Sequence, residues 1–139
     1  MLISEPDYEM VLENILFENV NIHNHYLIFG MTVYKNFIMR NVEFRNVTAN
    51  NGATIVRIIG VKDFQIENIT LSQVSTIDST DTKSAIFRIN EVHLGTPSDI
   101  KISNILYQNS NISMIKYDTV VFTPPVEKRI VFENIEFKD

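Results

Sequence analysis

One pattern of apolar and polar positions recurs five times along the chain: apolar-x-apolar-x-Asn-apolar-x-apolar. The copies occupy residues 10–17, 37–44, 64–71, 100–107 and 130–137. All twenty apolar slots hold apolar side chains, although only 45% of the chain is hydrophobic, so the pattern is not accidental. Alternation with a period of two predicts strands that bury one face.

The central asparagine of each copy predicts a corner between two strands. The alternation slips by one position at this residue, so that two inward apolar residues flank it. Asparagine tolerates the left-handed backbone conformation that a one-residue corner needs. The five corner residues are Asn14, Asn41, Asn68, Asn104 and Asn134, which are 27, 27, 36 and 30 residues apart.

A third strand is predicted between the copies, at residues 28–31, 55–58, 86–89 and 114–117. Its outward positions are predicted to form an apolar column beside a basic one: Ile28, Ile55, Ile86 and Met114 beside Arg57, Arg88 and Lys116. An uncovered apolar stripe invites association, so we expect these residues to form the main contact surface. The alternative is that a loop or a flanking segment covers the stripe.

Three strands per repeat, without helical patterns, predict an all-β solenoid of about five coils in a single segment, 1–139. The arrangement resembles the right-handed parallel β-helices of the pectin-lyase-like superfamily, through corners such as Ile-Met-Arg-Asn41-Val-Glu-Phe. This resemblance covers essentially the whole chain and implies that the corner asparagines stack in a ladder. The leucine-rich repeat is disfavoured, because its asparagine follows the last core residue by three positions rather than two.

Residues 44–55 also resemble the repeat of polymorphic outer-membrane proteins, which are bacterial surface adhesins. The other copies keep the aromatic residue and the asparagine but lose the small Gly-Ala step. The chain starts close to a strand and stops within one, and it shows no capping helix. Since open coil ends expose strand edges, we expect a piece of a longer solenoid or an end-to-end stack.

Candidate catalytic residues are few. Extra residues lengthen three loops: 75–83, 91–98 and 118–128. These are either binding loops or insertions that the surface tolerates. The lyases and hydrolases of the superfamily that the chain resembles use carboxylate clusters. The residues of this chain that come closest to such a cluster are Asp78 and Asp81, with Lys83. We therefore predict no catalytic or cofactor-binding residues.

Histidine and asparagine motifs are the remaining candidates for a metal site and for glycosylation. His23 and His25 form a His-x-His pair, but a zinc site needs three or four ligands, so a polar turn is favoured and no metal is expected. Glycosylation sequons begin at Asn46, Asn68 and Asn111. Asn68 is a corner residue, whereas Asn46 and Asn111 are expected in turns, where they could carry glycan.

Composition excludes several classes of function. The net charge of −5, with both signs mixed, argues against nucleic-acid binding. No apolar run approaches the ~20 residues that span a bilayer, and no signal peptide is visible. There is no cysteine, which excludes disulfides and thiolate metal sites.

These patterns predict a structural or adhesive repeat segment of an extracellular or cell-surface fibrous protein. Stacking and lateral contacts would be its mode of action, with other copies or flanking coils, or an acidic glycan, as partners. The alternative is a carbohydrate-active enzyme or carbohydrate-binding module of the lyase or glycoside hydrolase type.

Overall fold

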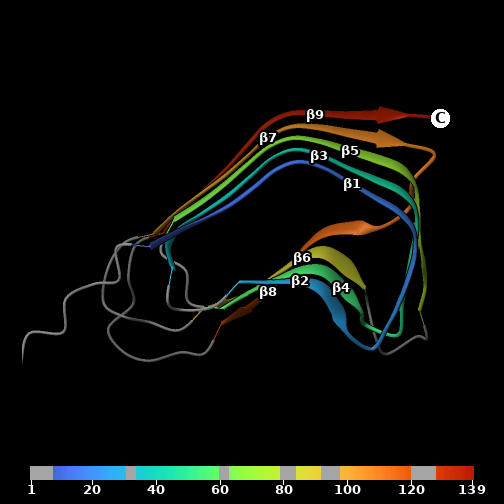
Figure 1. Ribbon diagram of the computed structural model, residues 1–139, viewed down its shortest axis with the longest axis horizontal. Coiled ribbons are helices and arrows are strands. Elements are labelled where there is room, and N and C mark those ends of the chain that lie inside the picture. Colours follow the sequence, from blue (N-terminus) through green and yellow to red (C-terminus); the bar gives the residue numbers. More distant parts are fainter. Residues whose placement is uncertain (1–7, 31–33, 60–62, 79–83, 92–97, 120–127) are drawn as a thin grey trace, which may run out of the picture.

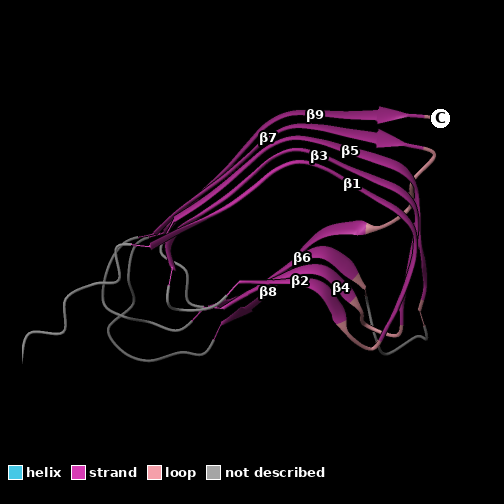
Figure 2. Cartoon of the chain, viewed as in Figure 1, coloured by secondary structure: helices cyan, strands magenta, loops and turns pink. Residues whose placement is uncertain are grey.

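The computed structural model describes residues 8–30, 34–59, 63–78, 84–91, 98–119 and 128–139. Within these residues the regular secondary structure is entirely β-strand, in two parallel sheets that face each other (Figures 1 and 2). The larger sheet has the order β1-β3-β5-β7-β9, and the smaller one has the order β2-β4-β6-β8. The predicted all-β class and parallel winding are confirmed.

The chain alternates between the two sheets, so that it winds as a parallel β-solenoid. The larger sheet consists of β1 (Tyr8–His23), β3 (Tyr34–Asn50), β5 (Asp63–Ile77), β7 (Ser98–Gln108) and β9 (Lys128–Lys138). The smaller sheet consists of β2 (Tyr26–Gly30), β4 (Thr54–Ile59), β6 (Ala85–Glu91) and β8 (Ser113–Thr119).

Strand pairing keeps the sequence repeats in register, so equal positions of the five repeats form columns along the solenoid axis. One such column contains Leu12, Met39, Ile66, Ile102 and Phe132. We call the strand that one repeat contributes to the larger sheet a row; neighbouring rows of a sheet are about 4.8 Å apart. The repeat pattern therefore becomes stacked columns of like side chains.

The number of turns is smaller than expected. Among the described residues, β3, β5 and β7 pair along both edges, whereas β1 pairs only with β3 and β9 only with β7. The wound part amounts to about three turns and not five coils. Counting motifs overestimated the number of turns, because each of the two end rows lacks a neighbour on one side within the described residues.

Each coil has one long and one short strand rather than three short ones. The long strands continue through their corners: β3 contains both Asn41, with a φ of 54°, and Asn46, with a φ of 51°. Ladder pairing resumes on both sides of each corner. The left-handed residues therefore bend the strands without ending them, as Figure 1 shows for the larger sheet.

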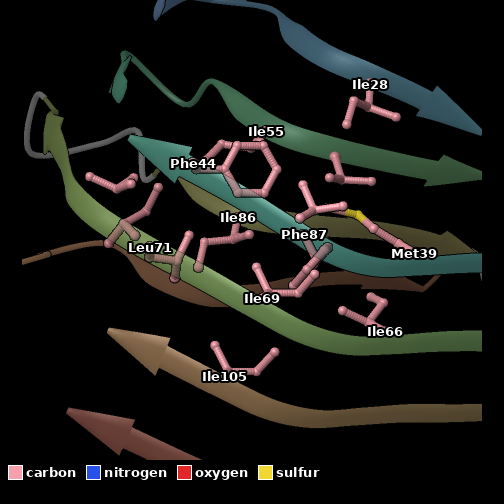
Figure 3. Packing of buried hydrophobic residues seen from close by; sticks show 14 of the residues in the cluster. Ile28, Met39, Phe44, Ile55, Ile66, Ile69, Leu71, Ile86, Phe87 and Ile105 are labelled. Carbon is pink, nitrogen blue, oxygen red and sulfur yellow. The ribbon is translucent and has the colours of Figure 1, made fainter. Parts of the chain in front are cut away.

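The core lies between the two sheets, and its burial varies along the axis. In the second row all four predicted inward residues are buried: Phe37, Met39, Val42 and Phe44. Residues of the smaller sheet, such as Phe87, pack opposite them (Figure 3). In β1 and β9 the same slots are partly or largely exposed, because no further row in the described part of the chain covers them.

Candidate functional site

The corner asparagines form a continuous side-chain ladder on the outside of the larger sheet. Each side-chain NH2 donates a hydrogen bond to the Oδ1 of the asparagine one row earlier. The donor-to-acceptor distances are 3.1 Å from Asn41 to Asn14, 3.0 Å from Asn68 to Asn41, 3.0 Å from Asn104 to Asn68 and 2.9 Å from Asn134 to Asn104. All five residues have a positive φ, between 54° and 57°. Backbone conformation and side-chain bonding thus both select asparagine here.

Replacing Asn41 tests both selections. Asn41→Val is expected to lower the free energy of unfolding by about 2–3 kcal/mol, because a β-branched residue is strained at positive φ and two ladder bonds disappear. Asn41→Gly should cost about 1 kcal/mol, because glycine adopts positive φ without strain. Chemical denaturation of both variants measures the difference. Equal costs would show that backbone conformation does not select the residue.

A second set of corners follows five residues after the first. Asn19, Asn46, Gln73 and Asn109 all have a positive φ. The side-chain NH2 of Asn46 donates to Asn19 Oδ1 at 2.6 Å. The prediction that Asn46 lies in a turn is therefore wrong, because the residue is a corner inside β3. Its amide is held as those of the first ladder are, which by the same argument as for Asn68 disfavours it as a glycan acceptor.

The second candidate acceptor, Asn111, has a different environment. It is exposed and forms an isolated parallel bridge with Ser75. Its backbone N–H donates to the carbonyl of Val74 at 2.8 Å. This bond fixes the backbone of Asn111 and leaves its side chain on the surface, so that Asn111 is the better placed of the two sequons.

The predicted apolar contact surface on the smaller sheet is wrong. Ile55 and Ile86 are fully buried, Ile28 is buried, and Met114 packs partly buried against the core. Figure 3 shows Ile55 and Ile86 among the side chains of the core. The prediction failed because strict alternation does not hold in these strands: the adjacent pairs Ile55–Val56 and Ile86–Phe87 are buried together.

The pairing of the smaller sheet also corrects the expected register. Ile28 lies beside Val56, so Leu27 and not Ile28 precedes Ile55 in its column. Arg57, Arg88 and Lys116 do lie in register, and their column continues to Phe29 of β2. The guanidinium of Arg57 lies 5.5 Å from the centroid of the Tyr26 ring. A basic column therefore exists, but without an apolar stripe beside it; the side chain of Lys116 lies outside the described residues.

Asp78 is hydrogen-bonded to Ser84, so that the two residues that flank segment 79–83 are held together. Its carboxylate accepts hydrogen bonds from the Ser84 N–H and the Ser84 hydroxyl, both at 2.6 Å, and from the Gly52 N–H at 3.3 Å. Desolvation alone would raise its pKa, but these bonds outweigh it, and the pKa of Asp78 is lowered. Asp78 therefore joins two coils across an insertion. The other members of the predicted cluster, Asp81 and Lys83, lie outside the described residues.

The charge on Asp78 should contribute to stability in a pH-dependent manner. Its folded-state pKa lies below the usual value of 3.8, so the contribution is present above that value and is lost as pH falls through the lower folded pKa. Asp78→Ala should cost about 1–3 kcal/mol at pH 7, because it leaves donors unpaired. Denaturation of the wild type and Asp78→Asn at pH 7 and pH 2.5 checks the sign. The difference in free energy of unfolding between the two proteins should be smaller at the lower pH. A difference that does not change with pH would contradict the role of the charge.

His23 lies at the end of β1 and His25 follows in the bend before β2. The Nε2 atom of His23 is 3.4 Å from the side-chain nitrogen of Asn51, and the His25 ring contacts Tyr26 edge-on. In the described part of the chain, no group of three or more His, Cys, Asp or Glu residues is placed to hold a metal ion. The polar-turn interpretation fits these contacts.

A groove of about 410 Å³ lies near the first residues of β1, β3, β5 and β7. Its polar lining includes Glu9, Asn36, Asp63, Asp99 and Lys101. The lining groups bond partly to one another, with Asn36 donating to Glu9 at 2.8 Å and the Asp99 N–H donating to Asp63 at 3.2 Å. Sequence reasoning missed this groove, although a polar residue directly before the first apolar slot of the repeats, as in Glu9, Asn36, Asp63 and Asp99, could have indicated it.

No family model, no curated protein and no solved structure matches this chain. The parallel solenoid therefore rests on the strand pairing itself, and the relation to the pectin-lyase-like superfamily stays a prediction from the corner motif. Over the residues that the structure describes, no helix has the length and hydrophobicity to cross a bilayer.

Proposed function

We propose that this chain is a structural and adhesive repeat segment of an extracellular or cell-surface fibrous protein. The observation that carries the proposal is the continuous asparagine ladder, which runs through all five rows of the larger sheet with apolar columns behind it. Such stacking makes every row hold its neighbours, so that length and stiffness grow with each repeat. A stiff rod with polar faces would allow a surface protein to extend away from the cell and to bind partners along its length.

Ion pairs between rows support the same function. Arg40 bridges to Glu13 at 2.9 Å and Arg45 to Glu18 at 3.0 Å, each across one row spacing. Lys101 and Glu133 form a comparable pair at 3.4 Å. All of these side chains are exposed or half-buried, so each pair is worth little singly. Together they let charges of both signs stack at short range without the repulsion of a single-sign column.

An acidic glycan is the proposed lateral ligand. The basic column on the smaller sheet, represented by Arg57 and Arg88, would favour carboxylates repeated along a polymer. Binding of polygalacturonate should weaken several-fold in Arg57→Gln with Arg88→Gln, and it should weaken with added salt. Arg40→Gln with Arg45→Gln, on the larger sheet and outside the groove, is the control that removes the same charge. Unchanged binding in the double variant would remove this ligand from the proposal.

The second candidate function is a carbohydrate-active enzyme or carbohydrate-binding module. The groove lined by Glu9, Asp63 and Asp99 favours it, because carboxylates bind sugar hydroxyls and pairs of them serve as acid and base in glycoside hydrolysis. Turnover should then depend on these groove carboxylates or on Asp78 and Asp81.

One experiment separates the structural function from the enzyme. The chain is incubated with calcium and a panel of acidic and neutral polysaccharides, and new reducing ends or unsaturated products are measured. The structural function predicts no turnover. Turnover that disappears in Asp63→Asn, Asp99→Asn or Asp78→Asn would establish the enzyme instead. Antibody labelling of intact, unpermeabilised cells that produce the protein tests the proposed location.

A further inference from the structure

The asparagine ladder has a direction. Every bond runs from the NH2 group of one row to the Oδ1 of the row before it. Among the described residues, nothing accepts from the NH2 group of Asn14 and nothing donates to Oδ1 of Asn134. The two ends of the ladder are therefore unlike: the β1 end presents a donor and the β9 end presents an acceptor.

The apolar columns end in the same way. At the β9 end, Phe137 is 72% exposed and Phe132 is 49% exposed, although both occupy inward slots. At the β1 end, Leu12 and Phe17 are half-buried in the corresponding slots. The aromatic column is stacked at both ends: the rings of Phe17 and Phe44 are 5.2 Å apart, and those of Tyr107 and Phe137 are 4.7 Å apart. Each end thus presents a face that fits a further row.

We propose that the β9 end of one copy binds the β1 end of a second copy, head to tail. This inference rests on the structural function proposed above and names its partner. In such a joint Asn14 of the second copy donates to Asn134, Phe17 stacks on Phe137, and Leu12 covers Phe132. Two β9 ends cannot join in this way, because they would place acceptor against acceptor. The interface is therefore heterologous and extends into a filament rather than closing as a dimer.

Charge and topology limit the strength of the joint. Glu18 of the second copy would lie over Lys138, which is favourable, whereas Glu13 would lie over Glu133, which is not. The row of β9 also extends one step beyond β8, the last strand of the smaller sheet. The contact is therefore made by the larger sheet alone, and we expect reversible assembly that depends on concentration.

A cysteine pair provides the test, because the chain has no cysteine of its own. Glu18, Arg45, Ser72, Gln108 and Lys138 lie in one column. Within one copy, Glu18 and Lys138 are four rows apart, about 19 Å, which no disulfide spans. Across the proposed joint they are one row apart, about 4.8 Å, which is within the range of a disulfide.

Glu18→Cys with Lys138→Cys should therefore give a ladder of covalent dimers, trimers and longer species on mild oxidation. The matched control is Glu18→Cys with Gln108→Cys, whose partners would be two rows apart across the joint, about 10 Å, and should not cross-link. A ladder from the first pair alone is the expected result. Monomers throughout, equal ladders from both pairs, or dimers from Lys138→Cys alone would overturn the head-to-tail joint.

A second measurement does not need cysteines. Phe132→Asp with Phe137→Asp places charge on exposed positions, so the variant should keep the wild-type circular dichroism spectrum and lose concentration-dependent sedimentation. Sedimentation equal to that of the wild type, with the fold intact, would also overturn the joint. Failure here leaves the structural function standing, with lateral contacts as its basis. Polysaccharide turnover would count against the structural function, whereas the cross-linking and sedimentation results would still show whether the joint forms.

Discussion

Ile55→Asp is expected to prevent folding of the chain, although the outward position predicted from sequence implied that folding would survive it and only association would be lost. Ile55 is 0% exposed and belongs to the core cluster between the sheets. An aspartate there would lose the apolar contacts of isoleucine and would bury a carboxylate without a partner. The cost should be on the order of 5 kcal/mol or more, which is comparable with the whole stability of a domain.

The control for Ile55→Asp is the same substitution at Ile77, which is 70% exposed at the end of β5. Ile77→Asp should change the free energy of unfolding by no more than about 0.5 kcal/mol. Circular dichroism and urea denaturation distinguish the two variants. A folded Ile55→Asp protein with near-native stability would mean that Ile55 faces solvent and that the predicted contact surface was right after all.

The larger sheet could be predicted from sequence because its pattern is compatible with only one assignment of inward and outward residues. Around Asn41 every second residue is apolar, the alternation slips once, and the slip coincides with a residue that tolerates positive φ. The same signal recurs in every row, so the register of β1, β3, β5, β7 and β9 follows from aligning the asparagines. Periodicity and backbone preference agree there, and the structure has both.

The smaller sheet could not be predicted in the same way. Residues 55, 56, 58 and 59 are all apolar, so a period of two has no preferred phase and does not say which face is inward. In the structure Ile55 and Val56 are both buried, which an alternating strand does not allow. The register predicted for the first coil was wrong by one residue for the same reason, because Leu27 and Ile28 are equally apolar.

The candidate site was only partly accessible to sequence reasoning. Asp78 could be singled out as an acidic loop residue, but its bonds to Gly52 and Ser84 join residues 26 and 6 positions away. Such contacts follow from the winding of the coils and not from local pattern. Asn46 shows the converse: its sequon was visible, but the pairing of its amide with Asn19 appeared only once rows were stacked.

Phe44→Ala should lower the free energy of unfolding by about 3–5 kcal/mol, because it leaves a cavity that the paired rows cannot close. Phe44 is fully buried and stacks on Phe17 within a column that continues to Leu71. Phe137→Ala is the matched control, with the same deletion in the same column but at the open β9 end. At concentrations too low for assembly, it should cost less than about 1 kcal/mol. Urea denaturation that gave both variants equal losses would show that burial does not follow the stacking of the rows.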